Sequence, residues 1–106
     1  MITASEVVGA VRRQAAEHPE KTARSCYIGQ DGPSCIIGHA LTDLGVGEDT
    51  LIPLNTDSIT YLVSFLFPTV ARNPQIVEWL QRVQDGQDKG WAWSVAVHDA
   101  DWAVLV

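Results

Sequence analysis

The sequence contains few basic residues. Its 106 residues include seven Lys and Arg against thirteen Asp and Glu, so the formal net charge is −6 at pH 7. After residue 24, three basic residues stand against ten acidic ones. Proteins bind the phosphates of nucleic acids mainly through Lys and Arg, so this composition argues against direct nucleic-acid binding. It leaves open a protein partner with a basic face.

Long apolar runs are also absent. No stretch reaches the roughly 18 apolar residues that a membrane-spanning helix needs. The N-terminal residues lack the basic and then apolar pattern of a signal peptide. We therefore expect a cytoplasmic protein that does not associate with a membrane.

Only two cysteines are present, Cys26 and Cys35. Disulfides are rare in the cytoplasm, and a domain of this length does not need one for stability, so we expect both thiols to be reduced. Hydrophobic residues, by contrast, make up 46% of the chain and include four Trp. This content is enough for one folded core, and we predict a single globular domain over residues 1–106.

The spacing of the apolar residues predicts a mostly α fold of about five helices. Thr3 and Glu6 have the pattern of a capping box, and the first helix is expected over residues 4–18 because a proline follows it. Further on, the pair Asp31-Gly32 favours a tight reversal. We therefore predict a short hairpin or turn between the first two helices.

Two more helices are expected in the middle of the chain. Ser34 is a suitable N-cap for a short helix over residues 35–44. Residues 46–55 contain a glycine and a proline and are predicted to be irregular. Thr56 or Asp57 can then cap a third helix, which ends at the next proline.

The C-terminal third is expected to contain the last two helices. Asn73 and Pro74 form an N-cap followed by proline at the first helical position, and Gly86 or Gly90 closes that helix. Residues 91–106 combine an alternation typical of a strand with a spacing that also suits a helix. We predict a helix, because its alanines favour helix and a lone C-terminal strand would have no long partner.

The four tryptophans are more than a small core buries with every indole N–H satisfied. In a helix, Trp93 lies about 200° around the axis from Trp91, so the two cannot share one face. We expect Trp91 to face inward. Trp anchors many protein interfaces, so Trp93 and Trp102 are the candidates for an interaction surface.

Both cysteines lie in one motif, in which a turn joins them. The motif and a few later positions are Cys26-Tyr27, Pro33-Ser34-Cys35-Ile36-Ile37-Gly38-His39-Ala40-Leu41, Gln84-Asp85, Trp91 and Ala100-Asp101. These residues resemble a group of small proteins from actinobacteria and their bacteriophages, and the similarity spans most of the chain. The resemblance implies a helical fold and a phage-encoded or phage-derived protein. It implies no cofactor, metal or catalytic residue.

The motif also permits a zinc site as an alternative. Cys35 and His39 are four residues apart and share a helical face, and Cys26 can fold back across the turn as a third ligand. A structural zinc site normally has four ligands, and the fourth is missing from the motif. We therefore predict no bound metal or cofactor, with a zinc-stabilised regulatory module as the alternative.

The same residues offer part of a thiol active site. Cys35 is expected at a helix N-terminus, which favours the thiolate, and His39 lies one turn further on. A working pair also needs an oxyanion donor and a pocket, for which the sequence gives no sign. We predict that the chain is not an enzyme. The expected function is that of a small acidic cytoplasmic protein that binds a protein partner or itself.

Overall fold

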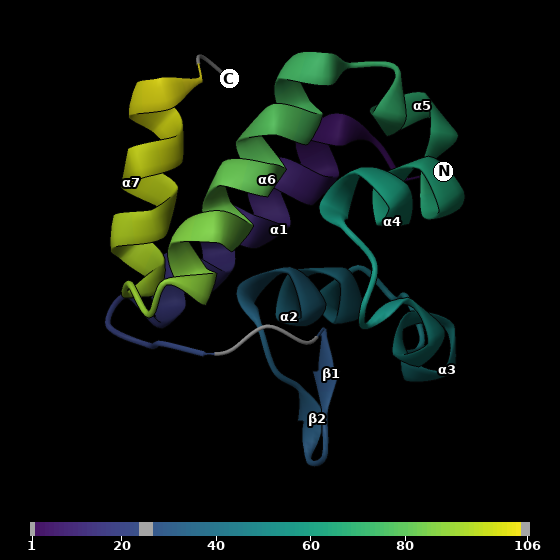
Figure 1. Cartoon of the computed structure of the whole chain (residues 1–106), viewed down its shortest axis with the longest axis horizontal. Helices are drawn as coiled ribbons and strands as arrows, with labels where there is room; N and C mark the ends of the chain where they lie inside the picture. The colour runs from purple at the N-terminus through teal and green to yellow at the C-terminus, as the bar shows by residue number, and fades with distance from the viewer. Residues whose placement is uncertain (1, 24–26, 105–106) are drawn as a thin grey trace.

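The computed structural model describes residues 2–23 and 27–104. Its elements are, in chain order, α1 (Ala4–Glu17), β1 (Ile28–Gly29), β2 (Gly32–Pro33), α2 (Ile36–Asp43), α3 (Glu48–Leu51), the 3₁₀ helix η1 (Ile52–Leu54), α4 (Ile59–Leu66), α5 (Pro68–Ala71), α6 (Pro74–Asp88) and α7 (Trp93–Ala103). The predicted mostly α fold is confirmed, and the predicted hairpin is present between α1 and α2 (Figure 1).

The longest helices lie side by side in one half of the molecule (Figure 1). α7 turns back along α6 after Gly90, whose φ of +89° is a conformation that glycine adopts readily. α1 packs against α2 and also contacts α6 and α7. In residues 2–23 and 27–104, no helix combines the length and the apolar character needed to cross a membrane.

The hairpin, α2, α3 and η1 form the other end of the molecule (Figure 1). β1 and β2 pair in antiparallel fashion, with Ile28 opposite Pro33. α2 lies close against the residue that precedes the hairpin, because Gly38 has no side chain. A Cβ atom at Gly38 would be 1.9 Å from the carbonyl oxygen of Tyr27.

The helices α1, α2, α4 and α6 each begin after a residue whose side chain caps the helix, with two shifts from the predicted positions. Thr3 and Glu6 form the predicted capping box. The N-cap of α2 is Cys35 rather than the serine before it, and that of α4 is Ser58 rather than either residue before it. Each cap accepts a hydrogen bond from the N–H three residues further on. The prediction of irregular structure over residues 46–55 was wrong, because α3 and η1 lie there.

One cluster of buried side chains joins the two halves. Trp79 of α6 and Trp93 of α7 are the largest fully buried side chains in the described residues. Fully buried side chains from other elements include Ile36 and Leu41 of α2 and Leu62 of α4. Burial of this apolar surface drives the packing of helices too short to be stable alone.

Candidate functional site

Cys35 is completely buried at the start of α2. Its sulfur accepts a hydrogen bond from the backbone N–H of Gly38, at 3.3 Å. Burial raises the pKa of the Cys35 thiol to about 11, which outweighs the opposing effect of this N–H. The thiol is therefore protonated at neutral pH, the opposite of what a nucleophilic cysteine requires.

His39 is half-buried beside α7. Its Nε2 lies 3.5 Å from Nζ of Lys21, and its ring centroid lies 5.4 Å from that of Trp93. Burial, followed by the charge of Lys21, lowers the pKa of His39. Cys26, the third residue of the zinc alternative, lies outside the described residues. Within residues 2–23 and 27–104, no three His, Cys, Asp or Glu side chains are grouped so as to hold a metal ion.

Trp93 is not on the surface: its exposed fraction is 0%. Its indole lies under Lys21, whose Nζ is 4.9 Å from the ring centroid, and against His18 and His39. The expectation that Trp93 belongs to an interaction surface was therefore wrong. The physical reason is that α7 begins at Trp93, so Trp91 precedes the helix and the helical angle between them does not apply.

Trp91 is half-buried in the turn before α7. It packs over Gly86 of α6, where a Cβ atom would be 2.7 Å from the ring. Nζ of Lys89 lies 5.1 Å from the centroid of the Trp91 ring. The predicted inward orientation of Trp91 thus holds for only part of the ring.

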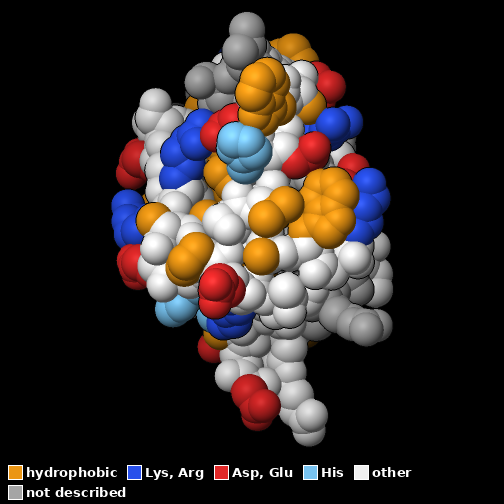
Figure 2. Space-filling model, turned by 90° about the vertical axis from the view of Figure 1, so that its left-hand side faces the viewer, with side chains coloured by type: hydrophobic (Ala, Val, Ile, Leu, Met, Phe, Trp, Pro, Cys, Tyr) orange, Lys and Arg blue, Asp and Glu red, His pale blue; other side chains and the backbone are white. Residues whose placement is uncertain are grey.

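Trp102 is the most exposed large hydrophobic side chain described, with 79% of its surface accessible. Its Nε1–H donates to Nε2 of His98, one turn earlier, at 2.9 Å. Val95, at 51% exposure, continues the same face of α7 toward the helix start. Figure 2 looks onto this side of the molecule and shows hydrophobic side chains among charged ones. We call Val95, His98 and Trp102 the α7 surface.

Ion pairs fix α7 to its neighbours. Arg12 of α1 donates two hydrogen bonds to Asp101, each 2.8 Å long, and the indole N–H of Trp79 donates to the same carboxylate at 2.9 Å. Arg82 of α6 lies 3.7 Å from Asp99. These pairs neutralise the two acidic residues of α7 and hold the helix in place.

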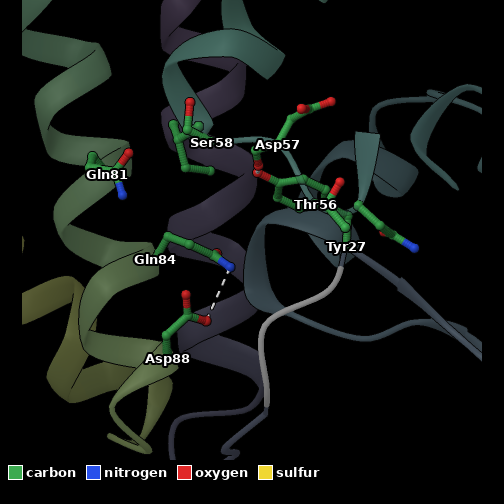
Figure 3. Close-up of a pocket in the computed structure, with 9 residues that line it drawn as sticks. Tyr27, Thr56, Asp57, Ser58, Gln81, Gln84 and Asp88 are labelled. Atoms are coloured by element: carbon green, nitrogen blue, oxygen red, sulfur yellow. Dashed lines mark hydrogen bonds between the residues drawn. The ribbon is translucent and has the colours of Figure 1, made fainter. Parts of the chain in front are cut away.

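A polar pocket of about 490 Å³ lies between the C-terminal half of α6 and the segment before α4 (Figure 3). Its lining residues come from three segments that are distant in the sequence: Tyr27, Asn55, Thr56, Asp57, Ser58, Ile59, Gln81, Gln84 and Asp88. This pocket was not predicted from the sequence. No local motif signals it, because the segments meet only in the folded chain.

Gln84 is the most unusual residue of this pocket. Its exposed fraction is 5%, and its Nε2 donates to Asp88 at 3.3 Å. Its Oε1 is buried and has no hydrogen-bond partner in the described part of the chain. By contrast, Gln87 uses both ends of its amide, accepting from Ile36 N–H and donating to Asp88.

Asp88 lies at the edge of the pocket and accepts both amides on one carboxylate oxygen. Burial raises the pKa of Asp88, and the hydrogen bond from Gln87 only partly opposes this. Among the described residues, no Lys or Arg forms an ion pair with this carboxylate.

Comparison with protein-family models, with curated proteins and with solved structures gives no match for this chain. The candidate sites therefore stand on their own chemistry.

Proposed function

We propose that the chain is a non-enzymatic protein-binding module that uses the α7 surface to bind a basic protein. The observation that carries the proposal is the exposure of Trp102, at 79%. An indole with this much apolar surface in water loses little entropy and gains much burial when a partner covers it. The resemblance noted above makes a cytoplasmic phage or actinobacterial protein the natural setting.

The α7 surface is also ready to bind without rearrangement. The hydrogen bond from Trp102 to His98 restrains the indole, and the ion pairs of Asp99 and Asp101 restrain the helix. A partner then avoids part of the ordering cost that reduces affinity at flexible surfaces.

The charge of the chain supports a basic partner over a second copy. At a net charge of −6, two copies repel each other, whereas a basic protein is attracted over a distance of about 10 Å at an ionic strength of about 0.1 M. Self-association is the competing occupant of the α7 surface.

Quantitative affinity capture tests the proposal. The wild-type chain and the Trp102→Ala and Phe65→Ala variants are used as baits in actinobacterial extracts, with and without phage infection. Phe65 is a matched control, because it is another exposed aromatic side chain, at 62%, on a different helix. We expect a protein of basic composition to be captured by the wild type and by Phe65→Ala, and to be lost with Trp102→Ala.

Equal capture by all three baits would contradict the proposal. Sedimentation velocity of the purified wild type gives the second measurement. A dimer that dissociates on Trp102→Ala would assign the α7 surface to self-association instead.

A further inference from the structure

We propose that the polar pocket between α6 and residues 55–58 is a binding site for a guanidinium group. No residue of α7 lines this pocket. The inference therefore goes beyond the proposed function and does not depend on it. It rests on an unpartnered buried acceptor, an uncompensated carboxylate and a cavity of sufficient size.

The amide of Gln84 supplies the buried acceptor. Its Oε1 is buried and unpartnered in the described residues, a state that costs free energy and that native structures largely avoid. A half-turn about the Cγ–Cδ bond exchanges the two ends of the amide. Oε1 then takes the position from which Nε2 now reaches Asp88 (Figure 3). Oε1 and the Asp88 carboxylate are then neighbouring acceptors, an arrangement that is favourable only when a cationic donor in the pocket contacts both.

The residues that line the pocket carry negative charge. Asp57 and Asp88 line it, and no Lys or Arg does. Neither carboxylate forms an ion pair with any residue that the structure describes. Figure 3 shows Gln84 and Asp88 extending from α6 into the space opposite Tyr27, whereas the carboxylate of Asp57 points away. Asp88 is thus the carboxylate that contacts the guanidinium group, and Asp57 adds to the negative electrostatic potential of the pocket.

The acceptors of the pocket suit a guanidinium group better than an ammonium group. A guanidinium group presents its N–H donors as a planar fork, which fits one carboxylate and a neighbouring amide oxygen better than a single ammonium does. It is also more weakly hydrated, so its entry into a partly enclosed pocket costs less. The volume of about 490 Å³ leaves room for the chain that carries the group.

A guanidinium group can come from a free small molecule or from an arginine side chain of a peptide. Both present the same chemistry to Asp88 and Gln84. Agmatine represents the first source, and an acetylated, amidated pentapeptide with one central arginine represents the second. Tighter binding of the peptide assigns the site to a protein ligand, and tighter binding of agmatine assigns it to a small molecule.

The central test is an NMR titration of the ¹⁵N-labelled chain with N-acetyl-L-argininamide. We expect saturable shifts of the Gln84 side-chain amide and of the backbone amides of Tyr27 and Ser58. N-acetyl-L-citrullinamide has nearly the same shape without the charge, and we expect it to bind at least about tenfold more weakly. The absence of saturable shifts, or equal binding of the citrulline compound, would overturn the proposal.

Three variants locate the site. Asp88→Asn removes the charge at nearly constant size and should weaken binding by about tenfold or more. Asp49→Asn removes the same charge from exposed α3 and should leave the affinity unchanged. Gln84→Met removes the acceptor and should weaken binding. It also removes the hydrogen bond from Nε2 to Asp88, so the melting temperature of this variant is measured to show that it still folds. Wild-type affinity in Asp88→Asn would refute the site.

Discussion

Gly38 is the residue whose missing side chain allows α2 to lie against Tyr27. A methyl group there would lie 1.9 Å from the carbonyl oxygen of Tyr27 and 2.7 Å from its carbonyl carbon, and backbone atoms cannot move aside cheaply. Gly9 is also inside a helix, but its added Cβ would meet nothing within 4 Å.

The two glycines give a matched pair of substitutions. We expect Gly38→Ala to lower the free energy of unfolding by about 3 kcal/mol or more, as overpacking in a rigid core does. Gly9→Ala should raise it by about 0.5–1 kcal/mol, because alanine is the better helix former. Urea denaturation of both variants measures the difference, and similar values for the two would contradict the close packing at Gly38.

The two tryptophans of α7 form a second matched pair, because Trp93 is buried and Trp102 is exposed. Trp93→Ala should lower the free energy of unfolding by about 3–5 kcal/mol, because it empties a fully buried site. Trp102→Ala should change it by no more than about 0.5 kcal/mol, because the indole is mostly in water. Thermal and urea unfolding of the two variants check this. A large loss with Trp102→Ala would show that the capture experiment measures folding rather than binding.

Cys35 should be chemically inert in the folded chain. With a pKa of about 11, roughly one molecule in ten thousand carries the thiolate at neutral pH, and the sulfur is fully buried. We expect iodoacetamide to leave Cys35 unmodified until urea unfolds the protein, as measured by peptide mass spectrometry. Rapid alkylation of Cys35 in the native state would revive the thiol-enzyme hypothesis.

Asp101 joins three helices at one carboxylate. The hydrogen bonds from Arg12, followed by the one from Trp79, lower the pKa of Asp101 below its usual 3.8, against the opposing effect of burial. A carboxylate whose pKa is lower in the folded state stabilises the fold above its unfolded pKa. The stabilisation is lost as the pH falls through the folded value. The pair is partly exposed, so the effect is modest.

Asp101→Asn should therefore lower stability by about 1 kcal/mol at neutral pH. The difference from the wild type should disappear in strongly acidic buffer, because Asp101 of the wild type is then protonated and, like asparagine, carries no charge. Melting temperatures across this pH range test the prediction, with Asp49→Asn as the control for the loss of one charge. A difference that persists in acid would assign the effect to packing.

Most elements could be predicted from the sequence because their signals are local. Apolar spacing and caps such as Thr3 and Asn73 identify α1 and α6 from a few neighbouring residues. The start of α7 was harder, because the alternation of Trp91 and Trp93 has two meanings. In the folded chain Trp91 packs over Gly86, and the helix begins two residues later.

The candidate sites could be predicted only in part, because their residues are brought together by the fold rather than by a local motif. Trp102 was identified as a surface candidate from its residue type alone. The pocket could not be, because Tyr27, Asp57 and Gln84 belong to three separate segments. Whether a glutamine side chain has a partner is a property of tertiary packing, which the order of residues does not reveal.

At the scale of the whole molecule, charge is unevenly distributed. Residues 25–71, which include the hairpin and α2 to α5, contain no Lys or Arg, and they contain Asp31, Asp43, Glu48, Asp49 and Asp57. Arg12 and Arg82 form ion pairs with acidic residues of α7. Approaching basic proteins are attracted by such a field, and polyanions are repelled.

The chain should therefore fail to bind duplex DNA even in dilute salt. Binding to phosphates requires basic side chains that release counterions, and residues 25–71 offer none. Fluorescence anisotropy with a labelled duplex should show no change at micromolar protein. Substituting Asp31, Glu48, Asp49 and Asp57 by Lys turns the net charge positive and should create weak, salt-sensitive binding. Salt-sensitive binding by the wild type would mean that a local basic site outweighs the net charge of −6.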